Sequence, residues 1–236
     1  MKKLALSFLL LCCCHLYAYS QANNIDKVHL RYPKPIISEI SAAVGPMFSY
    51  PIAGKFSKKY TAADLGMTAT VALSHRFKEW FSVVGALYYE QKGYKAIYHD
   101  INEAVIPNRE EKTVLTSKLQ YGTLALIPKF TPINRFPIYV GVGPYGSVLL
   151  RNEGIVERYV SGKRIYRQAF AQRKGSYIDY DYGITACLGY PWKINNKMTI
   201  VIEGRYIRGL TTINKPTIGE LTNNAFAIAI GMSLMK

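Results

Sequence analysis

Large apolar side chains recur at every second position along several segments of this chain. In residues 138–151 (IYVGVGPYGSVLLR), aliphatic residues alternate with glycine, serine and tyrosine. A period of two is that of a β-strand, whose successive side chains point to opposite faces. Each alternating segment is about 10 residues or longer, which is enough to cross a bilayer at a tilt. The pattern predicts eight strands, over residues 38–50, 65–77, 80–94, 119–130, 138–151, 180–190, 198–210 and 225–235.

The connections between the predicted strands alternate between short and long. The second and third strands are joined by KE, the fourth and fifth by TPINR, and the sixth and seventh by PWKINNK. Proline and asparagine in these segments are turn residues. The remaining loops are longer, at residues 51–64, 95–118, 152–179 and 211–224. Short periplasmic turns and long extracellular loops are typical of an outer-membrane barrel, so both termini are expected on the periplasmic side.

The two faces of the predicted strands differ in character. One face carries Val, Ile, Leu and Phe; the other carries small residues with isolated charges of both signs, and most remaining charge lies in the loops. A water-exposed face would carry many Lys and Glu, so the apolar face is expected to meet lipid. The sequence therefore predicts an all-β fold, an eight-stranded antiparallel up-and-down transmembrane β-barrel. A soluble periplasmic ligand-binding barrel, with the apolar face inward, is the alternative fold.

Charged residues on the inward face are expected to pair with one another, because an unpaired buried charge is costly. Counted from the short turns, they form two predicted layers. An eight-stranded barrel is filled by side chains, so no open pore is expected. The periplasmic layer contains Glu39, Arg76, Lys129, Glu203 and Arg205, and the outer layer contains Glu90, Lys92, Arg151 and Asp181.

The N-terminus has the features of a secretory signal peptide. Lys2 and Lys3 precede an apolar run that ends in AYSQA, so cleavage is expected near Ser20. The predicted organisation is a signal peptide over 1–20, a periplasmic segment over 21–35 and a barrel over 36–236. Of the four cysteines only Cys187 lies outside the signal peptide, which excludes a disulfide framework and a zinc site built on several cysteines. No cofactor is expected.

The loop between the fifth and sixth strands is strongly basic, in a chain of net charge +15. It interleaves basic with aromatic residues. An exported basic surface indicates an anionic partner such as lipopolysaccharide, a glycan or a protein, and no motif supports nucleic acid. The candidate binding residues are Arg158, Lys163, Arg164, Arg167, Arg173 and Lys174.

Five segments in order carry a family resemblance: LSHRF, YYEQKGYK, YVGVGPYGSVLL, DYGITACLGY and IEGRYIRGLTTI. Together they resemble the small outer-membrane β-barrel family of Bacteroidetes-type bacteria, the PorT-like or "outer membrane protein beta-barrel domain" proteins. The resemblance covers residues 36 to 236 and implies an outer-membrane location and assembly by the barrel insertion machinery. The chain departs from such barrels at Lys236, where they usually end in an aromatic residue.

No group of residues in the sequence predicts catalysis. Ser74 and His75 are neighbours on a strand and therefore point to opposite faces. His99 has Asp100 and Glu103 nearby, in a loop where a solvated cluster is the simpler interpretation. We therefore expect a non-enzymatic outer-membrane protein with a structural or surface-interaction role. The alternative function is that of a lipid A-modifying enzyme, which would need a nucleophile, a base and an acid at the height of the outer leaflet.

Overall fold

The structure is a computed structural model, and it describes residues 39–53, 61–100, 111–131, 137–171, 177–213 and 221–235. The predicted signal peptide and periplasmic segment lie outside the described residues, as do Arg173, Lys174 and Glu103. No helix among the described residues is long and apolar enough to cross a membrane.

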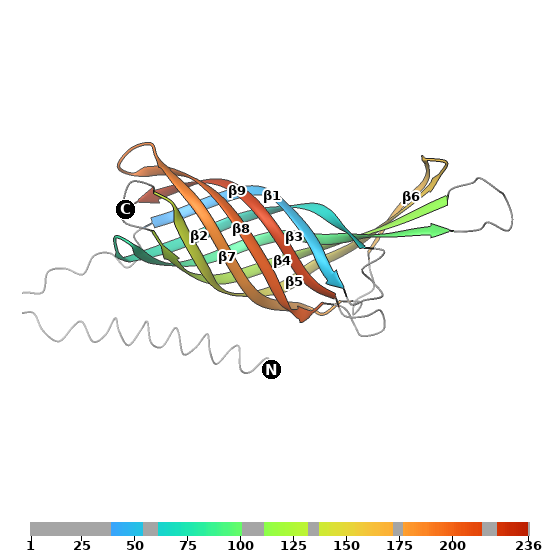
Figure 1. The fold of residues 1–236 in the computed structure, drawn as a ribbon, viewed down its shortest axis with the longest axis horizontal. Coiled ribbons are helices and arrows are strands. Elements are labelled where there is room, and N and C mark those ends of the chain that lie inside the picture. The colour runs from blue at the N-terminus through green and yellow to red at the C-terminus, as the bar shows by residue number, and fades with distance from the viewer. Residues whose placement is uncertain are drawn as a thin grey trace, which may run out of the picture. The chain divides into compact units, whose positions relative to one another are not determined.

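Eight antiparallel strands close into a ring (Figure 1). Each of the eight pairs with two neighbours, and the β4–β5 pairing completes the circuit. The eight-stranded up-and-down barrel predicted from the sequence is thus confirmed. Its strands are β1 (Glu39–Ala53), β2 (Thr61–Lys78), β3 (Phe81–Asp100), β4 (Glu111–Phe130), β5 (Tyr139–Val160), β7 (Tyr180–Lys193), β8 (Met198–Thr212) and β9 (Leu221–Met235).

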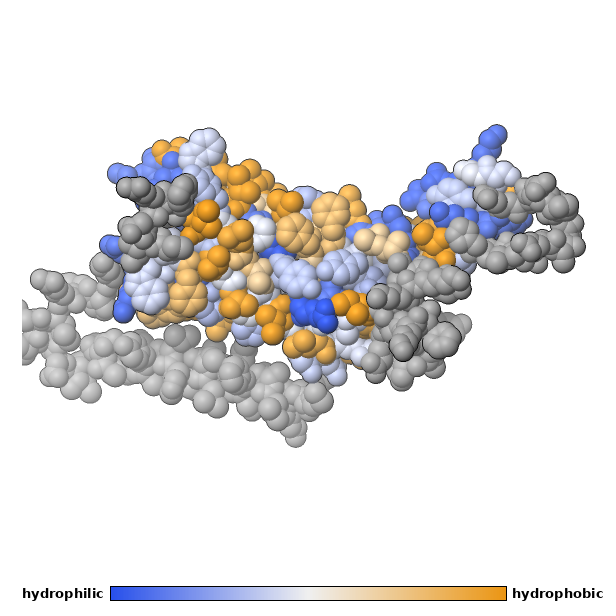
Figure 2. Space-filling view, in the orientation of Figure 1, coloured by the Kyte–Doolittle hydropathy of each residue, from blue (hydrophilic) through white to orange (hydrophobic). Residues whose placement is uncertain are grey.

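The outer wall of the barrel is apolar. Val140, Ile202 and Ile230 are 46%, 45% and 57% exposed, whereas Arg205 on the inward face is 3% exposed. Apolar side chains cover much of the barrel surface seen in Figure 2. A soluble monomer rarely exposes so continuous an apolar surface, and a barrel satisfies its backbone polar groups between strands. The wall therefore faces hydrocarbon, and the soluble barrel with an apolar interior is the wrong alternative.

Aromatic side chains cluster at the end of the barrel that carries the short turns. The Trp80 ring stacks on Phe130 with centroids 6.2 Å apart, and Phe81 lies 5.2 Å from Phe130. Tyr190 and Trp192 are exposed on the same rim. Amphipathic rings at this height form an aromatic girdle of the kind that marks a membrane interface.

Neighbouring strands approach closely where glycine faces the lumen. A Cβ on Gly45 would overlap the Ile228 carbonyl of β9, and a Cβ on Gly143 would overlap the Leu126 carbonyl of β4. The β1–β9 register also skips Gly45 and its neighbour Pro46, which has no N–H to donate. Glycine at these two positions allows the strong curvature of a narrow barrel.

A ninth strand, β6 (Lys163–Ala171), pairs with the outer half of β5. The outer halves of β3, β4 and β5 continue past the barrel as paired strands. At their outer ends Asp100 of β3 pairs with Glu111 of β4, and Glu111 pairs with Val160 of β5. Together they form a four-stranded sheet that projects from the end opposite the short turns (Figure 1). We call the residues in register with β6, namely 93–100, 111–118, 153–160 and 163–171, the outer sheet.

Candidate functional site

Four charged side chains form a layer across the middle of the lumen. Lys92 Nζ lies 3.0 Å from Glu90 Oε2 and 3.6 Å from Asp181 Oδ2. Arg205 Nη2 lies 2.9 Å from Glu90 Oε1. All four residues are 3% exposed or less. Two acids and two bases of this kind neutralise one another, so the layer meets the requirement that buried charges be paired.

Neutral hydrogen bonds complete this charge layer. Thr123 donates to Glu90 at 2.9 Å and shares a 2.7 Å hydrogen bond with Ser147. Asp181 accepts from Thr211 at 2.6 Å, and from Asn223 and Tyr145 at 3.1 and 3.2 Å. Arg205 donates to Thr68 at 3.1 Å. Buried carboxylates with several donors are held in one geometry, so the layer is rigid.

Tyrosine rings fill the space around the two cations. The Arg205 guanidinium lies 3.5 Å from the centroid of Tyr88, and Lys92 Nζ lies 5.1 and 5.0 Å from those of Tyr121 and Tyr145. Cations over aromatic faces gain electrostatic stabilisation. Above the layer, a buried apolar cluster closes the lumen further; it contains Leu119, Tyr121, Tyr177, Ile213 and Leu221.

At the outer edge of this cluster, hydroxyl groups link β3, β4 and the segment just before β7. The Tyr94 and Tyr177 oxygens are 3.0 Å apart, and Tyr177 donates to Ser117 at 3.0 Å. Burial, together with the neighbouring Tyr177 phenol, raises the pKa of Tyr94. Tyr94 therefore stays neutral at physiological pH and adds no charge to this end of the lumen.

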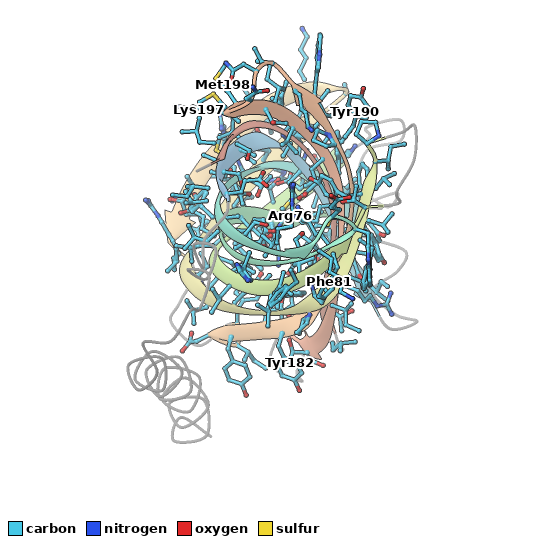
Figure 3. All side chains as sticks on the ribbon, turned by 90° about the vertical axis from the view of Figure 1, so that its left-hand side faces the viewer. Arg76, Phe81, Tyr182, Tyr190, Lys197 and Met198 are labelled. Carbon is cyan, nitrogen blue, oxygen red and sulfur yellow. The ribbon has the colours of Figure 1, made fainter. Side chains whose placement is uncertain are left out.

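A second ion pair lies nearer the short turns. Lys129 Nζ is 2.9 Å from Glu203 Oε2 and 4.0 Å from the centroid of Tyr139, whose hydroxyl also donates to Glu203 at 2.6 Å. Ser233 donates to Glu39 close to the rim. Figure 3, which views the barrel from the end of the short turns, shows Arg76 within the ring of strands. The Lys129–Glu203 pair therefore lies between the charge layer and the open end.

The lower half of the lumen is a chamber of about 450 Å³. Its walls carry small residues such as Ala72, Ser82 and Ala229, and Arg205 and Tyr88 form its floor. Glu39, Arg76 and Lys193 are among the charged residues that line it. The barrel is thus a cup that opens at the end of the short turns and is closed by the charge layer.

Two sequence-based placements need correction. Arg151 was expected in the outer lumen layer, but its side chain is 66% exposed and pairs with Glu153. The β4–β5 register shifts between Gln120 and Tyr121, so the bulge leaves Leu150 and Arg151 both exposed and breaks the alternation. Arg205 was expected in the periplasmic layer, but its long side chain reaches Glu90 and joins the outer one.

Basic residues of the outer sheet are partly neutralised by acids. Arg158 pairs with Glu111 at 2.5 Å. Arg164 Nη1 and Arg167 Nε lie 3.0 and 3.6 Å from the same oxygen, Glu157 Oε1. Lys163 is exposed at the start of β6. Two guanidinium groups on one carboxylate leave a local excess of positive charge.

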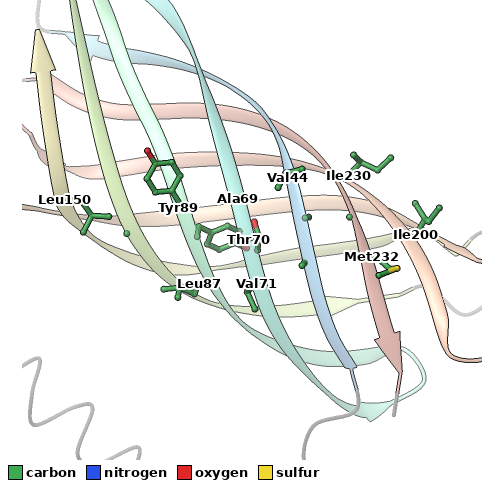
Figure 4. Close-up of a pocket in the computed structure, with 15 residues that line it drawn as sticks. Val44, Ala69, Thr70, Val71, Leu87, Tyr89, Leu150, Ile200, Ile230 and Met232 are labelled. Carbon is green, nitrogen blue, oxygen red and sulfur yellow. The ribbon is translucent and has the colours of Figure 1, made fainter. Parts of the chain in front are cut away.

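An apolar groove of about 800 Å³ crosses the barrel wall from β8 over β9, β1, β2, β3 and β4 to β5 (Figure 4). Small side chains at Ala42, Ala69 and Gly122 create it between larger ones such as Leu87 and Ile230. Its lining is almost entirely apolar. On a hydrocarbon-facing wall such a groove takes acyl chains, and it offers little that would recognise a particular head group.

Among the described residues, Ser74 and His75 do not face each other. Ser74 lines the chamber, whereas the His75 ring packs edge-to-face on Phe77, with centroids 4.4 Å apart. The side chains of His99 and Asp100 lie outside the description, as does Glu103. Within the described residues, no three His, Cys, Asp or Glu side chains are grouped to hold a metal ion.

Sequence reasoning missed the neutral residues that complete the charge layer. Tyr88, Tyr121, Tyr145 and Asn223 lie on the inward face, but their type does not distinguish a lumen partner from an ordinary strand residue. Tyr88, which lies two residues from the inward Glu90 on the same strand, is the one of the four for which the sequence carries such a signal.

Comparison with known proteins yields structural neighbours only. No family model matches the chain, and no curated protein does. Ail, the attachment invasion locus protein of Yersinia pestis, is 12% identical with a TM-score of 0.37, covering 84% of this chain and 99% of its own. The corresponding values are 13%, 0.41, 90% and 96% for the outer membrane protein AlkL, and 8%, 0.38, 89% and 99% for the outer membrane protease OmpT of Escherichia coli. Values this low assign neither a family nor an activity to the chain.

Proposed function

We propose that this protein is an integral outer-membrane β-barrel of a Gram-negative bacterium, without an open pore and without enzymatic activity. It is exported by a cleaved signal peptide, and its outer sheet serves surface interaction. The short turns and the chamber face the periplasm, and the outer sheet projects outside the cell, as is usual for such barrels. The finer placement with the PorT-like proteins rests on the five sequence segments described above.

The observation that carries this proposal is the charge layer of Glu90, Lys92, Asp181 and Arg205. The pairs are fully buried: Arg205–Glu90 connects opposite walls of the lumen, and Lys92 on β3 links Glu90 of the same strand to Asp181 on β7. They block passage of solutes, while the apolar outer wall supports insertion in a bilayer. A channel would instead need an open, water-lined path.

Two measurements on the full chain test the proposal. In outer-membrane fractions the protein should run on a gel at a heat-modifiable position, the behaviour of a folded barrel. In planar bilayers the purified protein should give no stable conductance, with an open porin as the positive control. Recovery in the soluble periplasm, or steady single-channel currents, would each contradict the proposal.

A further inference from the structure

Strand β6 is one exposed edge of the outer sheet. It pairs with β5 from Val160↔Lys163 to Glu153↔Ala171, and no strand of the described residues covers its other edge. All side chains from Lys163 to Phe170 are exposed. An edge strand presents unpaired N–H and C=O groups that can pair with another extended chain.

The positive charge along this edge favours an acidic partner. The Arg164 and Arg167 side chains are 50% and 57% exposed and share Glu157. Lys163 adds a third positive charge on the same strand. A single carboxylate balances one of these cations, so a further carboxylate would find an unsatisfied guanidinium. Charge-assisted hydrogen bonds to Arg are among the stronger ones.

Apolar side chains are interspersed with the basic ones along β6. Ile165, Tyr166 and Phe170 are 58%, 47% and 39% exposed. The Phe170 ring lies against Gly154, its partner on β5, where any Cβ would overlap it. The edge therefore combines a fixed backbone, positive charge and apolar contact area, which suits an extended polypeptide of mixed acidic and apolar residues.

The height of the edge argues against lipid as the partner. Leu150 is the last large apolar residue exposed on the barrel wall of β5, and Glu157 lies seven residues beyond it. At about 3.3 Å per residue, this separation is about 23 Å along the strand. Phosphates of membrane lipids lie at the hydrocarbon boundary, so Arg164 and Arg167 stand well beyond them.

We propose that the free edge of β6 binds an acidic, extended segment of a partner protein by strand addition. This inference rests on the proposed outward orientation of the outer sheet. Backbone pairing supplies the affinity, and carboxylates next to Arg164 and Arg167 supply the specificity. Exposed Ile165 and Tyr166 contact apolar residues that alternate with the acids.

The test uses the full chain in phosphocholine vesicles and a fluorescent peptide of about ten alternating Glu and Val residues, long enough to cover the nine residues of β6. The wild-type protein should bind the peptide, and hydrogen exchange of amides 163–171 should slow when the peptide is bound. Arg164→Glu together with Arg167→Glu should weaken binding about tenfold or more, because attraction becomes repulsion.

Three controls make the result decisive. Lys197→Glu changes charge at the opposite, short-turn end of the barrel and should leave binding unchanged. A peptide methylated on alternate backbone nitrogens keeps its charge but cannot pair as a strand, and it should not bind. Heparin, a sulfated glycan, should compete weakly. Every variant must first show the heat-modifiable gel shift of a folded barrel.

Several outcomes would overturn the inference. Equal binding of the methylated peptide would remove strand addition, and binding of heparin without the Glu–Val peptide would favour a glycan partner. If the protein is heat-modifiable and non-conducting but does not bind the peptide, the strand-addition inference is rejected and the proposed function stands. A protein that fails the heat-modification assay would instead count against the proposed function.

Discussion

Arg205 on β8 and Glu90 on β3 face each other across the lumen, with Nη2 and Oε1 2.9 Å apart. In the ring of eight strands, β3 and β8 lie four positions apart in either direction and are therefore opposite. The pair ties together walls that share no backbone hydrogen bonds. It also fixes the height at which the chamber ends.

Removing one member of this pair should destabilise the barrel strongly. Glu90→Ala removes the carboxylate that pairs with Arg205 and leaves Lys92 with Asp181. Breaking a buried ion pair on one side costs about 3–5 kcal/mol. The measurement is urea unfolding of the protein in vesicles, followed by tyrosine and tryptophan fluorescence.

A double substitution provides the control for that experiment. Glu90→Leu combined with Arg205→Met removes both charges and keeps similar volume, although Lys92 still has Asp181. The double variant should therefore be more stable than Glu90→Ala. If it is less stable, the cost comes from lost packing rather than from an unpaired charge.

The two outer-layer cations expected from the sequence should behave differently. Lys92→Ala removes a buried partner of Glu90 and Asp181 and should lower the free energy of unfolding by about 3 kcal/mol. Arg151→Ala removes an exposed partner of Glu153 and should cost about 1 kcal/mol or less. The same unfolding assay compares them, and equal losses of stability would show that Arg151 also pairs within the lumen.

A positive charge on the barrel wall should be costly only where the wall meets hydrocarbon. Ile230 and Ile165 are 57% and 58% exposed, the first on β9 in the barrel and the second on β6 in the outer sheet. Ile230→Arg should cost about 2–4 kcal/mol if it lies near the bilayer midplane. Ile165→Arg should stay within about 0.5 kcal/mol. Similar stability of both variants in vesicles would argue against lipid contact.

The chamber should admit reagents from the end of the short turns. In a Cys187→Ala background, Ser82→Cys places a thiol on the chamber wall, whereas Thr123→Cys places one in the charge layer, where Thr123 is 2% exposed. A membrane-impermeant maleimide applied from the periplasmic side should label the first and spare the second. Equal labelling of the two would mean that the layer does not seal the lumen.

Much of the barrel was predictable because its lipid-facing strands alternate strictly. Val140 and Val142 on β5 are an example: when every second residue is large and apolar, the pattern assigns each residue of the strand to one face. The outer halves of the long strands lack this signal. Around Glu153 and Arg158 of β5, for example, polar and apolar residues do not alternate, so the predicted strand ends at Arg151 and β6 falls within a predicted loop.

By itself, then, the sequence determined which residues face hydrocarbon and which face the lumen, because side-chain alternation is a local property of the strand. Only the tertiary structure decided which charges meet. Arg205 selects Glu90 because barrel closure and side-chain length set distances across the lumen, and Arg151 leaves the lumen because a bulge shifts the register against β4. Both effects depend on strands that lie together in the barrel but are separated in the sequence, so the residue types along a single strand do not predict them.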